Sequence, residues 1–364
     1  MHRYLVDASP LKNNVHTLRK RAGERTFWAV IKGDGYGLGL APMAKLLADC
    51  GVDHFAVTEP ADVQSLRAAG LTDAKILVLR PTTDRDEVSQ LLSLGAIFTL
   101  SSQDDAAVLS DMAVRMAAKA EAHLKIDTGM GRYGFLPSEL DKILPLFAPS
   151  DHLLITGVYS HFHSAFCNKR QTVAQFTSFL SVLNALKEAN IDYGMAHICN
   201  SVGLLRFPEY ALDGVRVGSA LLGRLSFQGN FGLKRVGYCE ATVDELRWLP
   251  AGHSTGYGAA WRAKKPTRIA VLPIGYYHGF GCTVGDDIFR PRDELRKIFG
   301  ACKRLLFKKS LYVTLNGRSC RVLGHIGMLH TVIDVTDCDC KLGDTAILDI
   351  NPILLRGMDV VFKE

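Results

Sequence analysis

The sequence predicts an N-terminal (β/α)8 barrel of the TIM type, followed by a smaller and mostly antiparallel β domain. Up to about residue 225, short apolar runs alternate with amphipathic helical patterns. After Gly229-Asn230-Phe231-Gly232 the pattern changes to β-branched runs separated by turn residues. A chain of 364 residues is also long enough for a barrel of about 250 residues and a second domain. We therefore expect a barrel domain over residues 1–228 and a β domain over residues 229–364.

Eight strands are expected in the barrel, and helices are expected between them. Apolar runs place the strands at residues 28–32, 54–58, 75–80, 96–100, 122–127, 153–160, 194–199 and 215–217. Helical patterns lie at residues 41–50, 61–69, 86–94, 103–116, 137–147, 171–189 and 202–207. This regular alternation favours a closed barrel, and an open, doubly wound sheet is the alternative.

The β domain is expected to contain one helix among its strands. The strands are predicted at residues 239–246, 268–272, 311–315, 319–323, 331–335 and 345–350, and the helix at residues 292–307. This helix belongs to a basic segment, residues 290–309, with eight basic and two acidic residues. We interpret the segment as a solvated basic helix, and contact with an acidic partner or substrate is the alternative.

Composition excludes several classes of protein. No apolar run approaches the roughly 18 residues of a membrane span, and the first residues contain no signal-peptide core. The net charge of +6 is modest for this length and gives no reason to expect a nucleic acid partner. The nine cysteines contain no CxxC pair, and Cys338-Asp339-Cys340 lacks the second cluster that a metal site needs. We expect a cytoplasmic protein with no metal, nucleic acid or membrane partner.

Polar residues follow five of the predicted strands. The apolar residues 28–31 lead to Lys32 and a loop with four glycines, and the other polar stretches are residues 123–132, 159–163, 197–201 and 215–219. The carboxyl ends of barrel strands meet on one face, so we expect these stretches to form one site.

The residue types in these stretches indicate a particular cofactor. A lysine at the dry end of a barrel is more easily neutral, and a neutral amine condenses with an aldehyde. Ser201 and the backbone amides of Gly218 and Ser219 are suited to hold a phosphate. With Arg216 facing a ring, these groups predict pyridoxal phosphate.

Several motifs resemble those of alanine racemases. They are Lys32-Gly33-Asp34-Gly35-Tyr36-Gly37-Leu38-Gly39, residues 125–132, Asn200-Ser201, Arg216-Val217-Gly218, residues 254–259 and residues 273–276. The resemblance extends over the whole chain in the same order. It implies a pyridoxal phosphate-dependent amino-acid racemase that interconverts L- and D-alanine. It also implies a head-to-tail homodimer in which the partner subunit completes each site.

The resemblance assigns two acid/base groups. Lys32 binds the cofactor as a Schiff base and acts on one face of the substrate α-carbon, while Tyr257 of the other subunit acts on the opposite face. Racemisation needs both, because a single group that returns its own proton mostly regenerates the starting isomer. A neighbouring cation such as His161 or Arg132 would help Tyr257 to lose its proton. Arg216 resembles the residue bonded to the pyridine nitrogen, to which a guanidinium cannot give a proton.

The resemblance also implies the remaining binding residues. Tyr36, His161, Asn200, Ser201, Gly218 and Ser219 are expected to bind the cofactor. Arg132, Met328 and Tyr276 are expected to bind the substrate. Lys125 matches a lysine that many family members carry in carbamylated form.

The chain departs from the family pattern around the expected approach to the site. The departures are Phe166, His278, Cys282, His325, Leu329 and Phe362. They leave open a racemase for another amino acid, such as serine or one with a larger side chain. Two further alternatives are a pyridoxal phosphate-dependent lyase or decarboxylase and a non-catalytic cofactor-binding protein.

Overall fold

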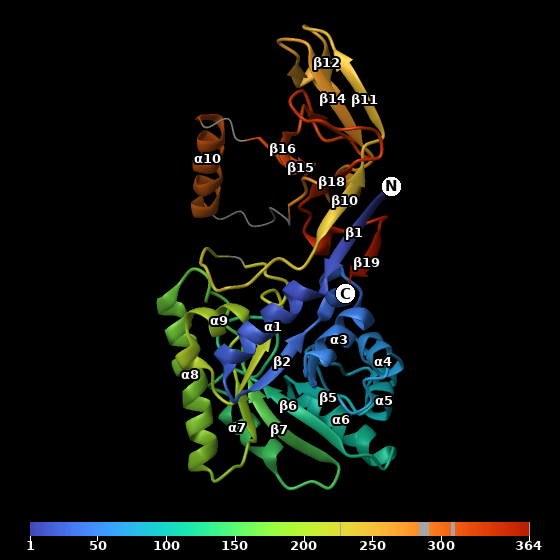
Figure 1. The fold of residues 1–364 in the computed structure, drawn as a ribbon. Coiled ribbons are helices and arrows are strands. Elements are labelled where there is room, and N and C mark those ends of the chain that lie inside the picture. The colour runs from blue at the N-terminus through green and yellow to red at the C-terminus, as the bar shows by residue number, and fades with distance from the viewer. Residues whose placement is uncertain (226, 284–290, 307–309, 364) are drawn as a thin grey trace. The chain divides into compact units, whose positions relative to one another are not determined.

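The structure is a computed structural model that describes residues 1–225, 227–283, 291–306 and 310–363. The chain forms two compact units (Figure 1). Residues 8–236 form one, which we call the barrel unit. Residues 1–7 and 237–363 form the other, which we call the β unit. The first seven residues therefore belong to the β unit, although they were expected in the barrel domain.

Eight parallel strands of the barrel unit close into a barrel in chain order, with the last strand paired to the first. They are β2 (Thr26–Val30), β3 (His54–Val57), β4 (Lys75–Val78), β5 (Ile97–Leu100), β6 (Ala120–Lys125), β7 (Leu153–Tyr159), β8 (Met195–His197) and β9 (Gly214–Val217). The prediction of a closed barrel is confirmed. The alternative of an open sheet is wrong, because β9 pairs with β2 through residues 214–217.

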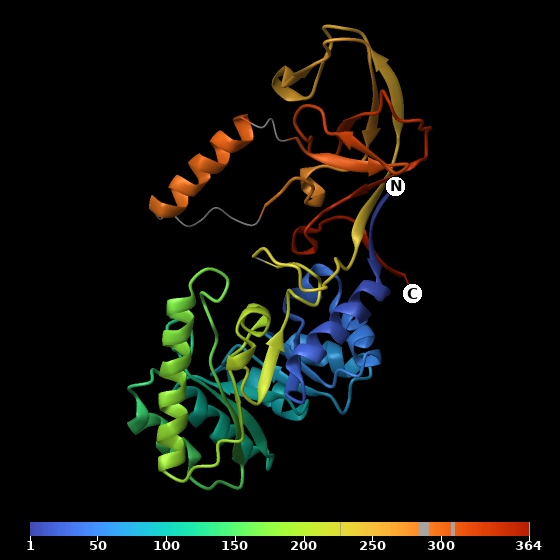
Figure 2. The same ribbon diagram turned by 60° about the vertical axis from the view of Figure 1, so that its left-hand side comes forward.

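The helices of this unit lie around the outside of the barrel (Figures 1 and 2). They are α1 (Ala8–Ala22), α3 (Leu40–Asp49), α4 (Pro60–Ala68), α5 (Arg85–Ser93), α6 (Gln103–Arg115), α7 (Leu140–Ile143), α8 (Lys169–Glu188) and α9 (Ser201–Arg206), with 3-10 turns η1 (Leu144–Phe147) and η2 (Pro208–Tyr210). The predicted helix 137–147 is thus a short α-helix followed by a 3-10 turn, since Pro145 lacks the N–H that a longer α-helix needs.

The segment that follows β2 differs from the predicted loop. The strand ends at Val30, and α2 (Lys32–Gly37) is a left-handed turn with positive φ at each residue from Gly33 to Tyr36. Glycine adopts this conformation readily, whereas Asp34 and Tyr36 do so at a cost. The Asp34 carboxylate compensates by accepting the Leu40 N–H at 2.8 Å, which ties the turn to the start of α3.

The β unit contains three sheets among its described residues. The largest has the order β16-β15-β18-β10-β1-β19, the second β11-β14-β17, and the third β12-β13. The strands are β1 (His2–Asp7), β10 (Tyr238–Thr242), β11 (Glu245–Leu249), β12 (Ser254–Thr255), β13 (Trp261–Arg262), β14 (Thr267–Leu272), β15 (Tyr312–Leu315), β16 (Arg318–Arg321), β17 (Thr331–Asp334), β18 (Thr345–Leu348) and β19 (Asp359–Lys363). The predicted strand 239–246 is two strands, β10 and β11, that belong to different sheets.

The first strand explains why the chain start belongs to this unit. β1 pairs with β10 in antiparallel fashion and with β19 in parallel, and its residues Tyr4, Leu5 and Val6 are buried. Every other strand pair of this unit is antiparallel, so the prediction of a mostly antiparallel β domain is confirmed.

A single helix longer than one turn is described in the β unit, α10 (Pro291–Leu306), at the predicted position. Arg290 and residues 307–309 of the basic segment lie outside the described residues. The unit also has 3-10 turns η3 (Tyr257–Ala259), η4 (Tyr276–His278) and η5 (Pro352–Leu354). Neither α10 nor any other described helix is long and apolar enough to cross a membrane.

Candidate active site

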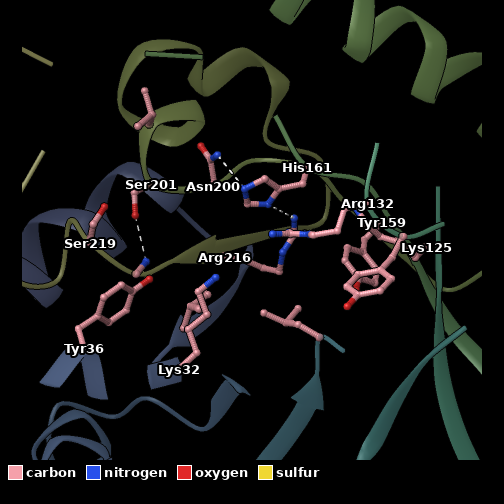
Figure 3. A pocket seen from close by; sticks show the side chains of 15 residues that line it. Lys32, Tyr36, Lys125, Arg132, Tyr159, His161, Asn200, Ser201, Arg216 and Ser219 are labelled. Atoms are coloured by element: carbon pink, nitrogen blue, oxygen red, sulfur yellow. Dashed lines mark hydrogen bonds between the residues drawn. The ribbon is translucent and has the colours of Figure 1, made fainter. Parts of the chain in front are cut away.

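A cavity of about 200 Å³ opens at the carboxyl ends of the barrel strands. Figure 3 shows Tyr36, Ser201 and Ser219 on one side, Lys125, Arg132 and Tyr159 on the other, and Lys32 with Arg216 between them. The lining residues come from most of the strand ends and are Val30, Lys32, Tyr36, Leu79, Lys125, Arg132, Tyr133, Tyr159, His161, Asn200, Ser201, Val202, Arg216, Gly218 and Ser219. The predicted site residues of the barrel are therefore brought together.

Lys32 occupies the first position of the left-handed turn, directly after β2. Burial lowers the pKa of its amine, and the positive charge of Arg132 lowers that pKa further. Both effects favour the neutral amine, which is the form that attacks a carbonyl carbon or accepts a proton.

Arg216 lies in β9 and is held by three neighbours. Its guanidinium donates to His197 Nδ1 at 2.5 Å and to the carbonyl oxygen of Ser160 at 2.5 Å, and it approaches His161 Nδ1 at 3.4 Å. Burial lowers its pKa to about 10, so it remains charged at neutral pH. A fixed positive charge therefore lies at the floor of the cavity.

A pair of buried histidines continues from Arg216 into the barrel. Because His197 Nδ1 accepts from Arg216, its Nε2 is the atom that donates to His123 Nδ1 at 2.9 Å. Burial lowers the pKa of His197 well below its usual value, and that of His123 to about 4, so both rings are neutral. The imidazole of His197 also stacks on Tyr159 at 5.0 Å, which fixes the ring that orients Arg216.

His161 is neutral for the same reason. Burial, followed by the charges of Arg216 and Lys125, lowers its pKa well below the usual value. The expectation that His161 supplies a cation near Tyr257 is therefore wrong, and Arg132 is the remaining candidate. The amide of Asn200 lies 3.3 Å from His161 Nε2 and donates to the Phe162 carbonyl at 3.0 Å, which positions the imidazole in the wall of the cavity.

The turn that presents Arg132 is organised by Asp127. One carboxylate oxygen accepts the N–H groups of Gly129 and Met130 at 2.9 and 2.7 Å. The other accepts those of Gly131 and Arg132 at 2.8 and 3.2 Å. Asp127 belongs to the polar stretch 123–132 that was expected to form part of the site, but it does not line the cavity. Its carboxylate instead holds the backbone of this turn.

Lys125 is an exception among the buried polar groups. Its Nζ atom has no hydrogen-bond partner among the described residues, and it lies 4.7 Å from the centre of the Tyr159 ring. Burial, followed by the charge of Arg216, lowers its pKa well below the usual value. Burying this amine as a charged ammonium group costs free energy, so the neutral form is favoured. The neutral amine is nucleophilic.

Replacing Lys125 by methionine is expected to stabilise the cofactor-free protein at pH 7 by about 1–3 kcal/mol, because the variant buries no unpaired polar group. The unfolded chain binds the Lys125 proton more tightly than the folded chain does. The wild type therefore gains stability as pH rises from the lowered pKa towards 10.5, and the gap between the proteins narrows. Urea unfolding across pH in bicarbonate-free buffer measures this gap, and Lys119→Met on the surface is the matched control. A gap that widens with pH would contradict the argument.

Four groups on the opposite side of the cavity are suited to an anion. Ser201 Oγ accepts the N–H of Gly218 at 3.0 Å, which leaves its proton free to donate. Burial raises the pKa of Tyr36 to about 12, so its hydroxyl is also a donor. A Cβ atom at Gly218 would collide with that hydroxyl, so only glycine allows this close approach. Ser219 completes the group.

Three of the predicted site residues belong to the β unit and lie on its surface. Tyr257 is 80% exposed, and Met328 and Tyr276 are about half exposed. The N–H of Tyr276 donates to Gly327 O at 3.1 Å, and that of Tyr277 to Met328 O at 3.1 Å. The backbone thus holds Tyr276 and Met328 side by side on one exposed surface.

Sequence reasoning missed several residues of the site. Tyr133, Leu79, Val30 and Val202 line the cavity but are ordinary apolar or aromatic residues in the sequence. Tyr159 was noted only as part of a polar stretch. Its hydroxyl lies 2.8 Å from Thr99 Oγ1, and its ring lies beneath Lys125 and Arg216. For Val30 in β2 and Tyr159 in β7, alternation along the strand was the only signal that they face inward. Leu79 follows β4, Tyr133 lies in a loop and Val202 lies in α9, so the sequence pattern gave no signal for them.

The residues that depart from the family pattern occupy two kinds of environment. Phe166, Cys282, His325 and Leu329 are exposed. His278 is buried, its Nδ1 accepts the Gly275 N–H at 3.1 Å, and its ring lies 4.3 Å from that of His2. Phe362 lies in β19 opposite Val6. His278 therefore has a structural role within the β unit.

Comparisons with known proteins agree on one family. The family model for "Alanine racemase, N-terminal domain" matches residues 6–226, and that for "Alanine racemase, C-terminal domain" matches residues 236–352. An alanine racemase of Methylacidiphilum infernorum is 34% identical over 347 residues, covering 94% of this chain and 82% of that protein. An alanine racemase of Clostridium tetani is 32% identical over 351 residues, covering 94% and 84%.

Solved structures share the fold. The alanine racemase from D-cycloserine-producing Streptomyces lavendulae matches with a TM-score of 0.84 and 23% identity, covering 100% of this chain and 97% of that chain. The alanine racemase of Streptomyces coelicolor matches with a TM-score of 0.83 and 23% identity, covering 99% and 97%. With two family models that together match most of its length, the chain belongs to the alanine racemase family.

Proposed function

We propose that this protein interconverts L- and D-alanine with pyridoxal phosphate as its cofactor. The single observation that supports this best is Lys32, an amine with a lowered pKa at the end of a barrel strand. It shares one cavity with the charged Arg216 and with a group of hydroxyl and amide donors. The names of the relatives support alanine as the substrate.

The residues present fit the cofactor. Tyr36, Ser201, Gly218 and Ser219 would hold its phosphate, and the glycine at 218 lets the Tyr36 hydroxyl lie close to the backbone on this side of the cavity. Arg216 would face the pyridine nitrogen, and His161 and Asn200 would line the ring. Pyridoxal phosphate, when bound, withdraws electrons from the substrate α-carbon, so that the α-proton is removed more easily.

Arg216 would limit the reaction to racemisation. It stays positively charged, with its donors directed by His197 and Ser160, and it cannot protonate a pyridine nitrogen. An unprotonated ring draws electrons less strongly, which disfavours transamination. His197, which is neutral like its neighbour His123, accepts from the guanidinium through Nδ1 and so orients it without neutralising its charge.

Two groups would move the α-proton. Lys32 would accept or donate it on one face of the α-carbon, and Tyr257 of a partner subunit would do so on the other. We propose a homodimer because the resemblance to alanine racemases implies one, and because Tyr257, Tyr276 and Met328 are exposed on the β unit, where a partner subunit could contact them. In this arrangement the β unit supplies the second base. Arg132 would bind the substrate carboxylate together with Met328 and Tyr276.

Lys125 would be carbamylated in the active enzyme. Its Nζ has no hydrogen-bond partner in the part of the chain that the structure describes, its pKa is lowered, and Arg132 is a nearby positive charge. Carbon dioxide forms a carbon–nitrogen bond with a neutral amine, and the amine releases one proton to solvent. The resulting carbamate anion would pair with Arg132. The nine cysteines are all unpaired, which supports a reducing compartment such as the cytoplasm.

The substrate is tested by incubating the purified enzyme and pyridoxal phosphate with single L-amino acids in deuterium oxide. We expect deuterium at the α-carbon of alanine together with formation of D-alanine. Serine and larger amino acids are the controls, since the exposed Phe166, Cys282 and Leu329 differ from the family pattern. Turnover of serine without alanine would overturn the choice of substrate and retain the racemase reaction.

A further inference from the structure

The helix α10 has two unlike faces. Leu295, Ile298, Cys302 and Leu305 follow one another at intervals of three or four residues, and Phe299 lies four residues after Leu295. These residues therefore share one side of the helix. The exposed fractions of Leu295, Ile298, Phe299 and Leu305 are 55, 58, 72 and 79%, and Cys302 is also exposed. We call this side the apolar stripe of α10. It is uncovered in the described structure.

A helix of this kind is unfavourable in water alone. Its 16 residues span about 24 Å, and isolated helices of this length are marginally stable. Contiguous exposed apolar surface on a protein marks a site of contact with a membrane or another protein. The apolar stripe therefore indicates that α10 binds to the surface of a membrane or of another protein.

The charge around the stripe favours an anionic surface. Residues 290–309 contain eight of the 43 basic residues and two of the 37 acidic residues, which leaves 35 of each in the rest of the chain. The whole net charge of +6 is thus concentrated in this segment. Two copies of α10 packed together would repel each other, and a nucleic acid would leave the apolar stripe exposed.

We propose that α10 binds the surface of a membrane that contains anionic lipids. The apolar stripe would lie among the acyl chains near the headgroups, and basic residues outside the stripe, such as Arg296 and Lys303, would contact the headgroup phosphates. A length of about 24 Å is too short to cross the roughly 30 Å of hydrocarbon, so the helix lies in the plane of the surface. The contact is reversible and independent of the racemase reaction.

The test is vesicle flotation of the full-length holoenzyme with phosphatidylcholine vesicles, with and without phosphatidylglycerol. We expect binding to the vesicles that contain phosphatidylglycerol, weakened by added salt. Phe299→Glu is expected to reduce the affinity by at least about tenfold, because it places a charge in the apolar stripe. Arg296→Gln with Lys303→Gln is expected to reduce it by about fivefold per residue.

The matched control is Leu342→Glu, which changes a leucine that is 61% exposed outside α10 and should leave binding intact. Amide exchange should slow in residues 291–306 when the anionic vesicles are added. Absence of flotation, or equal loss with the Leu342 and Phe299 variants, would overturn the proposal. A change of oligomeric state in Phe299→Glu without vesicle binding would also overturn it, since the stripe would then bind a second copy. Racemase activity in solution should be unchanged in every variant, which separates this proposal from the proposed function.

Discussion

Replacing Lys32 by alanine is expected to lower the rate of alanine racemisation by at least about 10³-fold in both directions. The cavity then keeps its anion-binding groups and Arg216 but loses the amine that would bind the cofactor covalently and move the proton. Both directions fall together because the free energies of L- and D-alanine in solution are equal. The measurement is the rate of D-alanine formation from L-alanine, and of the reverse, with saturating pyridoxal phosphate.

The matched control for this variant is Lys45→Ala. Lys45 lies in α3 with an exposed side chain, so its removal changes the net charge equally and leaves the cavity intact. The midpoint of urea unfolding should be similar or slightly higher for Lys32→Ala, because the variant no longer buries an amine whose pKa is lowered. A variant that keeps its fold and retains activity within tenfold of the wild type would remove Lys32 from its proposed role.

The sequence was sufficient to predict the barrel because its strands are continuous apolar runs. A strand such as Phe55–Val57 is buried on both faces, and that requirement is visible in residue types alone. The same logic brought Lys32, Arg132 and Arg216 to one face, since the direction of each parallel strand fixes where its end lies. These predictions needed only the local pattern of apolar residues and the rule that the carboxyl ends of the strands lie on one face of a barrel.

Other features depend on contacts between residues that are distant in sequence. β1 and β19 come from opposite ends of the chain, and no local pattern indicates that residues 3–7 pair with residues 359–363. The left-handed turn after β2 also escaped prediction, because Asp34 and Tyr36 adopt positive φ only when contacts such as Asp34 to Leu40 hold them. The prediction failed where long-range pairing or local strain determines the backbone.

The electrostatics of the site were predictable in part. Burial of Lys32 was correctly expected to favour its neutral form. The neutral state of His161 was not expected, because it depends on the nearby charges of Arg216 and Lys125 as well as on burial. The hydrogen bonds that link Arg216, His197 and His123 could not be predicted either, because they form only when three separate strands lie side by side.

Replacing Tyr257 by phenylalanine is expected to separate two reactions that the wild type couples. Racemisation should fall by about 10²- to 10⁴-fold in both directions, because each direction needs both bases. Exchange of the α-proton with solvent should behave differently. The isomer whose α-proton faces Lys32 should still exchange it in deuterium oxide with retention of configuration, while the other isomer should not.

The measurement is α-deuteration of L-alanine and of D-alanine, followed separately by mass spectrometry and chiral chromatography. Tyr312→Phe is the matched control, since Tyr312 is also an exposed tyrosine of the β unit but lies in β15. If Tyr257→Phe slows exchange of both isomers equally, the phenol positions the substrate without acting as a base. If it slows neither exchange nor racemisation, another group supplies the second base. Only a loss confined to one isomer agrees with a proton that leaves one face through Lys32 and returns on the other through Tyr257.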